Sequence, residues 1–142
     1  MMLMLVLGCG LGWFAREINR ARAQREAVKA IRKLGGLVGE EPSGGLGDEP
    51  SGGMVVTEVF LGRTRISDVG LAQLQGLPQL RRLYLDNTTV SDAGLKHLRG
   101  LTQLVLLELR GTEITDAGLV HLTGLTKLQA LRLGNTQVTD AG

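Results

Sequence analysis

Four aspartates recur at a constant spacing and form the first group of residues in this chain that could do chemistry. Asp68, Asp92, Asp116 and Asp140 lie 24 residues apart, each directly after a serine or threonine. Stacked in space, such carboxylates could bind calcium. The sequence lacks the oxygen-rich loop of a calcium site, however, and an aspartate just after a helix N-cap suits the positive end of the helix dipole. We therefore interpret the four aspartates as structural.

Two histidines share this spacing. His97 and His121 are also 24 residues apart and could face each other. Two imidazoles without a third ligand indicate metal only weakly. The sequence also has no phosphate loop with its lysine and hydroxyl, and no nucleophile with a base beside it in sequence. We expect no enzyme activity, no metal and no cofactor.

The leucines follow the same 24-residue period, which predicts a repeat protein. Leu80, Leu83 and Leu85 recur 24 and 48 positions later, and more degenerately 24 positions earlier. An L-x-x-L-x-L pattern at this period predicts one strand and one helix per repeat, stacked on its neighbours. The alternation in each strand points Leu83 and Leu85 into the core and Arg82 and Tyr84 outward. A threonine after each strand is expected to hydrogen-bond the turning backbone; these are Thr64, Thr88, Thr112 and Thr136.

The second half of each repeat has the pattern of a short helix. A serine or threonine stands at each expected N-cap, namely Ser67, Ser91, Thr115 and Thr139. Leucines at helical spacing follow, as in Leu71, Leu74 and Leu77. Glycines are expected to cap the C-terminal ends; they are Gly76, Gly100 and Gly124.

The recurring phrases, such as Ser91-Asp92-Ala93-Gly94-Leu95, resemble the leucine-rich-repeat superfamily. They are most similar to the short TDAGL-type repeats of bacterial proteins and more distantly similar to the repeats of F-box substrate receptors. The resemblance covers residues 56 to 142. It implies an α/β solenoid with a parallel sheet on its concave face, short helices on its convex face and protein binding on the sheet. Threonine replaces the ladder cysteine of the F-box type and no F-box precedes the repeats, so recruitment to a ubiquitin ligase is not implied.

Residues 1 to 15 carry no charged side chain and are followed by several arginines. Trp13 and Phe14 beside Arg16 are typical of a membrane boundary, and the positive-inside rule then places the repeats on the cytoplasmic side. Fifteen helical residues reach only ~22 Å, against a hydrocarbon core of ~30 Å. Three interpretations stay open: a spanning helix whose start lies outside this sequence, a secretion signal, and an apolar helix buried in protein. We favour a membrane anchor.

Residues 16 to 38 are expected to form a basic helix and an N-terminal cap. The helix should cover residues 14 to 34 and stop at Gly35. Its apolar residues near the end favour a cap over the first repeat, although a basic helix lying on anionic lipid is the alternative. The nearly duplicated octapeptides of residues 39 to 53 predict a flexible acidic linker, and residues 54 to 142 form the repeat domain, with three full repeats and a partial one.

The composition limits the classes of partner that we expect. The formal net charge is +2, and no cluster of bases gathers in the repeats, so we expect no nucleic-acid binding. The single Cys9 cannot form an internal disulfide.

The outward side of the sheet is the candidate binding surface. Stacking the repeats at their period places Phe60, Tyr84, Glu108 and Arg132 in one column. The structural interpretation pairs Glu58 with Arg82, Asp86 with Arg110 and Glu108 with Arg132 between neighbouring strands, each pair contributing ~0.2–1 kcal/mol. The functional interpretation is a partner-binding face, because aromatics beside arginines are typical interface anchors. Its expected residues are Phe60, Arg82, Tyr84, Glu108, Arg110 and Arg132.

These observations predict a noncatalytic protein-binding scaffold, tethered to a membrane, with an unknown protein ligand. The alternative is a fragment of a larger leucine-rich-repeat receptor or enzyme-associated protein whose active part lies elsewhere. The sequence ends with Thr139-Asp140-Ala141-Gly142, an N-cap and three residues of a repeat helix without its leucines. We therefore expect the last leucines to be poorly covered, and this end to be soft or to self-associate; they are Leu125, Leu128, Leu131 and Leu133.

Overall fold

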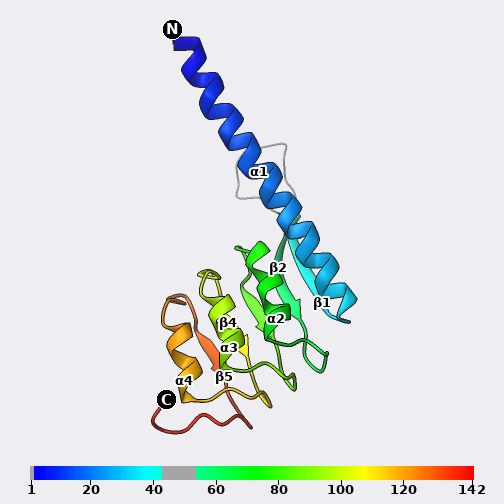
Figure 1. The fold of residues 1–142 in the computed structure, drawn as a ribbon, viewed down its shortest axis with the longest axis vertical. Coiled ribbons are helices and arrows are strands. Elements are labelled where there is room, and N and C mark those ends of the chain that lie inside the picture. Colours follow the sequence, from blue (N-terminus) through cyan, green and yellow to red (C-terminus); the bar gives the residue numbers. More distant parts are fainter. Residues whose placement is uncertain (1, 43–53) are drawn as a thin grey trace.

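One long helix and a short antiparallel strand precede a stack of repeats. The computed structural model describes residues 2–42 and 54–142. Helix α1 (Met2–Lys33) leads through a turn into β1 (Leu37–Pro42). In Figure 1, α1 extends well beyond the repeats at one end, and the C-terminus lies at the opposite end of the stack.

The strands form a single sheet in sequence order, β1-β2-β3-β4-β5. After β1 come β2 (Met54–Phe60), β3 (Arg82–Tyr84), β4 (Leu106–Glu108) and β5 (Ala130–Arg132), which pair in parallel. Only β1 is antiparallel to its neighbour β2. Each parallel register joins residues 24 apart, such as Leu83 and Leu107, as the period requires.

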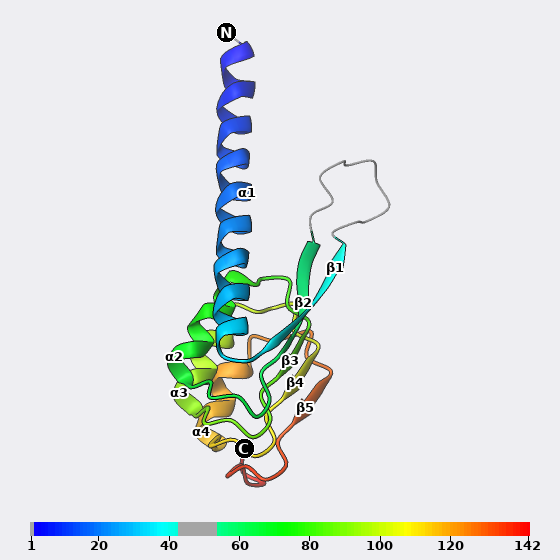
Figure 2. The same ribbon diagram turned by 90° about the vertical axis from the view of Figure 1, so that its right-hand side faces the viewer.

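Short helices cover one face of the sheet, as Figure 2 shows. In each repeat one α-helical turn continues into a 3-10 helix. These pairs are α2 (Asp68–Leu71) with η1 (Ala72–Gly76), α3 (Asp92–Leu95) with η2 (Lys96–Leu98), and α4 (Asp116–Leu119) with η3 (Val120–Leu122). The α/β solenoid expected from the period is thus confirmed.

Leucines from the strands and from the short helices fill the space between these two layers. Leu83 and Leu85 from β3 and its turn, and Leu95 and Leu98 from the helical side, have no exposed surface. In the last repeat this burial weakens: Leu131 is 38% exposed, whereas Leu107 is fully buried. Of the other leucines expected to be poorly covered, Leu128 and Leu133 are partly buried, whereas the prediction is wrong for Leu125, which is buried. The consequence for flexibility or self-association stays a prediction.

The threonine after each strand has the expected role. Thr64, Thr88, Thr112 and Thr136 each donate their hydroxyl to the carbonyl three residues earlier, at 2.6–2.7 Å. The residue before the threonine has a positive φ in every repeat, and these residues are Arg63, Asn87, Gly111 and Asn135. The chain therefore leaves the sheet through a left-handed turn that the threonine closes.

The expected N-cap hydrogen bonds form in part, and the expected glycines lie at the helix ends without left-handed backbone. The hydroxyls of Ser91 and Thr115 accept from the amides two residues on, at 3.3 and 3.2 Å, while Ser67 makes no such bond. Gly76 ends η1, and Gly100 and Gly124 follow the ends of η2 and η3 by two residues, at the expected positions. None of the three has a positive φ, so they are not left-handed caps. Each repeat helix ends in a 3-10 turn, which needs no left-handed residue.

The end of α1 caps the first repeat, as expected. Ala27 and Ile31 are buried, and a Cβ on Gly76 would lie 2.7 Å from the carbonyl oxygen of Ala23. Gln24 also donates to the carbonyl of Met54 at 2.8 Å. The helix ends at Lys33, and Gly35, whose φ is +84°, turns the chain toward β1. The helix begins earlier than the expected residue 14, since α1 runs without a break from Met2.

The segment expected to be a linker begins later than predicted. Residues 39 to 42 belong to β1, because backbone hydrogen bonds to β2 need no apolar side chains. Residues 43 to 53 lie outside the described part of the chain. Among residues 2–42 and 54–142, no helix combines the length and apolar character needed to cross a bilayer.

Candidate protein-binding surface

The expected columns on the concave face are present. Parallel registers place Glu58 beside Arg82, and Phe60 beside Tyr84. The next registers add Glu108 beside Tyr84 and Arg132 beside Glu108. The six residues predicted for partner binding therefore come from β2 to β5 and the turn after β4. These residues, which we call the concave surface, are Phe60, Arg82, Tyr84, Glu108, Arg110 and Arg132.

Phe60 and Tyr84 stack on each other. Their ring centroids are 4.6 Å apart and their planes differ by 9°. Phe60 is 38% exposed and Tyr84 is partly buried. Stacking of neighbouring aromatics on a sheet stabilises the pair of strands. Both rings keep part of their surface exposed.

Two of the three expected ion pairs are formed. Arg82 pairs with Glu58, and Nη1 of Arg132 lies 3.4 Å from Glu108 Oε2. Arg110 does not pair with Asp86 as predicted. Its Nε instead donates to Glu108 Oε1 at 2.6 Å. The side chains of residues 108 and 110 share one face of the chain, so Arg110 reaches the nearer carboxylate.

Glu108 is the main correction on this surface. It was expected to be exposed, yet it is only 2% exposed, although it lies on the concave side. Arg110 and Arg132 both bind its carboxylate, and their own side chains stay 54% and 55% exposed. A buried carboxylate is tolerated when charged donors satisfy it. Glu108 thus positions two arginines and offers little surface of its own.

The convex side contains no assembled site in the described residues. His97 Nδ1 lies 3.3 Å from Gln75 Nε2, and His121 contacts Arg99, so the two histidines do not pair with each other. Over residues 2–42 and 54–142, no group of three or more histidine, cysteine or acidic side chains is close enough to hold a metal ion.

The aspartates have a role that the sequence reasoning missed. Asp68 accepts from the backbone amide of Ser91 at 2.8 Å and from its hydroxyl at 2.7 Å. Asp92 binds Thr115 in the same way, and Asp116 binds Thr139. Each carboxylate joins one repeat to the next. The side-chain and then the backbone hydrogen bond of Thr139 lower the pKa of Asp116 below its ordinary value of 3.8, against a smaller opposing effect of desolvation.

Comparison with solved structures identifies the fold. The ectodomain of the receptor kinase SOBIR1 from Arabidopsis thaliana, described as a leucine-rich-repeat ectodomain, superposes with a TM-score of 0.53 and 17% identity. The match covers 82% of this chain and 68% of that one. The chain is a leucine-rich-repeat protein by fold. An internalin from Listeria monocytogenes matches 60% of this leucine-rich-repeat chain with 24% identity and a TM-score of 0.42, and this chain spans 30% of the internalin.

Other comparisons of the leucine-rich-repeat chain gave no match. No family model matches it, and no curated protein does so. The closer similarity to bacterial TDAGL-type repeats stays a prediction.

Proposed function

We propose that the chain is a noncatalytic scaffold that binds a protein partner on its concave surface. The stacked pair of Phe60 and Tyr84 carries this proposal, because it presents apolar area in a protein with only four aromatic residues. Aromatic rings flanked by arginine are enriched among residues that dominate binding energy. The leucine-rich-repeat fold is consistent with this role.

Charged groups surround the stack. Arg82, Arg110 and Arg132 keep between 54% and 55% of their side chains exposed while each contacts a glutamate. Their glutamates fix the guanidinium groups without covering them. A partner would therefore meet rigid aromatic area flanked by positioned donors, which lowers the entropy lost on binding.

The test begins with an aromatic photocrosslinker in place of Tyr84, which keeps a ring at this position while capturing the partner in cells. Binding of the captured protein is then measured with Tyr84→Ala. We expect a loss on the order of 2 kcal/mol if Tyr84 is a central anchor. Lys96→Ala on the convex side is the matched control and should change binding little. Normal folding and parental affinity of Tyr84→Ala would place the partner on another surface.

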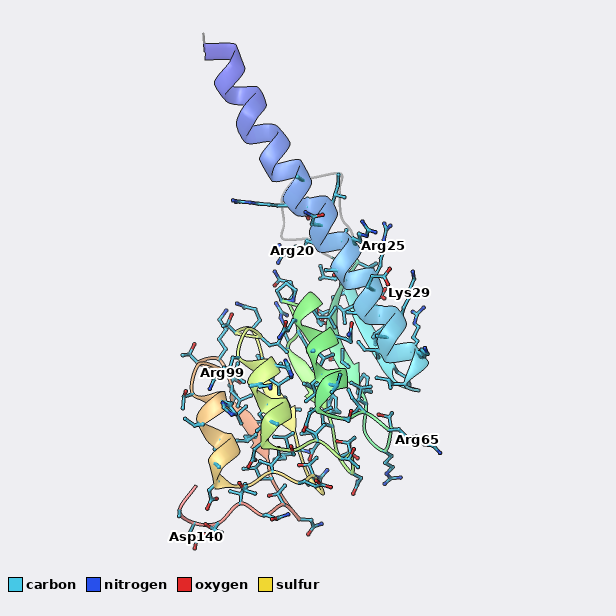
Figure 3. The ribbon with its side chains drawn as sticks, viewed as in Figure 1. Arg20, Arg25, Lys29, Arg65, Arg99 and Asp140 are labelled. Carbon is cyan, nitrogen blue, oxygen red and sulfur yellow. The ribbon has the colours of Figure 1, made fainter. Side chains whose placement is uncertain are left out.

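We also propose that the N-terminal part of α1 attaches the repeats to a membrane surface. Residues 15 to 23 are exposed, and Figure 3 shows Arg20 and Arg25 on α1 close to the point where the helix leaves the repeats. Residues 1 to 15 have no charged side chain, and arginines follow them. Insertion of the apolar residues into one leaflet, with the arginines on anionic headgroups, does not require a span. The anionic cytoplasmic leaflet would then carry the repeats on the cytoplasmic side.

Vesicle flotation tests the attachment. The full chain should float with vesicles that contain phosphatidylserine, and removal of residues 2 to 15 should leave it at the bottom of the gradient. Glutamine at positions 16, 20, 22 and 25 should reduce flotation with anionic vesicles and not with neutral ones. A full chain that stays unbound to both kinds of vesicle contradicts the proposal.

A further inference from the structure

A pocket of about 340 Å³ lies at the edge of the concave face, where the chain enters the parallel strands. Thr57 and Glu58 of β2, Arg81 and Arg82 at the start of β3, and Glu41 of β1 contribute to its wall. Gln103 and Lys127, from the turns before β4 and β5, complete the opposite side. The pocket shares Arg82 with the concave surface but lies outside the aromatic stack.

The charges in this pocket do not balance. Glu41 lies 3.6 Å from Arg81, and Glu58 pairs with Arg82, so each carboxylate of the wall has its own arginine. Lys127 donates to the Gln103 side-chain oxygen at 2.6 Å. Within the described residues Lys127 has no carboxylate at ion-pair distance. One positive charge is therefore left without a counter-charge, together with the remaining N–H groups of Arg81 and Arg82.

Thr57 adds a buried polar group without a partner. It is 3% exposed, and its hydroxyl has no hydrogen-bond partner among the residues that the structure describes. The β1–β2 register passes from Glu58 directly to Val56, so Thr57 lies in a bulge opposite no β1 residue. Unsatisfied buried hydroxyls are uncommon in native proteins because they are costly. This one lines the pocket.

We propose that the pocket binds the carboxylate of an aspartate or glutamate side chain on the partner that docks at the concave surface. The proposal rests on the proposed function, since it names part of what the partner presents. The carboxylate accepts from Lys127 and Arg81, and its charge matches the unbalanced one. The Thr57 hydroxyl gains an acceptor at the same time.

The position of the pocket also sets the spacing of the partner's residues. Arg82 at the pocket and Tyr84 in the aromatic stack belong to one strand, two residues and about 7 Å apart. An extended segment of the partner with an acidic and an aromatic residue two positions apart reaches both sites. The partner is thus expected to present an extended segment with this pair.

Blocked tripeptides test the proposal on the full chain by NMR titration. One contains phenylalanine, alanine and glutamate; the matched peptide has glutamine in place of glutamate, and both are used in the forward and reversed orders. The glutamate peptide should bind about fivefold tighter than its glutamine counterpart in at least one order. Lys127→Gln should abolish this preference without changing the affinity for the glutamine peptide, and Lys96→Gln should preserve it.

Thr57→Val separates a binding role from a purely structural one. Removal of an unsatisfied hydroxyl should raise the unfolding midpoint, while the glutamate peptide should bind about threefold more weakly because it loses a donor. Equal affinity for glutamate and glutamine peptides, or a preference that survives Lys127→Gln, would overturn the proposal. Failure of the proposed function looks different: Tyr84→Ala would then leave the affinity for both peptides unchanged, while the glutamate preference persists.

Discussion

Thr115 binds Asp92 of the preceding repeat through two hydrogen bonds that use both carboxylate oxygens. The backbone amide of Thr115 donates to Oδ1 at 2.8 Å, and its hydroxyl donates to Oδ2 at 2.6 Å. The same hydroxyl accepts from the amide of Ala117 at 3.2 Å. One threonine therefore caps its own helix and fastens that helix to the one before it. This bidentate contact recurs at every junction between described repeat helices.

Asp92→Ala should destabilise the chain by about 2 kcal/mol, because hydrogen bonds to a charged group typically contribute 1.5–3 kcal/mol and this site is partly exposed. Urea unfolding followed by circular dichroism measures the free energy of unfolding. Asp140→Ala is the matched control, since Asp140 is exposed and should change stability by less than about 0.5 kcal/mol. Equal effects of the two substitutions would contradict a linking role for Asp92.

Gly118→Ala should destabilise the protein even though alanine is the better helix former. A Cβ at position 118 would lie 2.2 Å from Asp92 Oδ1, so the contact between repeats must open. We expect a loss of about 1–2 kcal/mol, as for other overpacked sites. Gly124→Ala has nothing within 4 Å of the new Cβ and should be neutral or stabilising by up to about 1 kcal/mol. If the unfolding midpoint of Gly118→Ala is not below that of Gly124→Ala, the prediction is wrong.

The contact between Asp116 and Thr139 should weaken in acid. Its hydrogen bonds lower the pKa of Asp116 in the folded state, so the stabilisation is complete above the ordinary value of 3.8 and is lost as the pH falls through the lower folded value. An NMR titration of the Asp116 carboxyl measures that pKa. Thr139→Ala should move the pKa back toward 3.8, because the side-chain hydrogen bond is its main cause. An unchanged pKa in this variant would contradict the assignment.

Arg110 and Arg132 should act on stability in a coupled way. Either single alanine substitution leaves Glu108 with one arginine and should cost about 1 kcal/mol, whereas the double substitution leaves a buried carboxylate unpaired and should cost about 3 kcal/mol or more. Glu108→Gln should restore much of the stability of the double variant. Additive single effects in chemical unfolding would mean that Glu108 is better hydrated than its 2% exposure indicates.

The repeat period was enough to predict the sheet and its columns. Residues 24 apart must stack, and alternation within each strand decides which side chains point outward, so Phe60 and Tyr84 could be paired before any coordinates. The threonine turns followed from local hydrogen bonding within three residues. These features depend on one repeat or on the simple translation between repeats.

What the sequence did not predict depends on side chains that cross between repeats. The helix dipole explains why an acidic residue stands at the start of each repeat helix. It does not explain why that residue is always an aspartate with a glycine two positions later, as in Asp92-Ala93-Gly94. This constant pair was the sequence signal for the contact between repeats. Burial of Glu108 was missed because alternation gives the direction of a side chain, whereas the folding of Arg110 and Arg132 over it depends on side-chain rotamers. Residues 39 to 42 of β1 were missed because their composition is that of a linker.

The junction between repeats makes the length of this solenoid easy to change in evolution. Each aspartate hydrogen-bonds to the serine or threonine 23 positions later. The contact is the same whichever two repeats provide the aspartate and the hydroxyl residue. Excision of residues 91 to 114 would bring Thr115 to the same distance from Asp68, with the left-handed turns and leucines still in phase. Unequal recombination within the gene could thus lengthen or shorten the array by whole repeats while every joint is preserved.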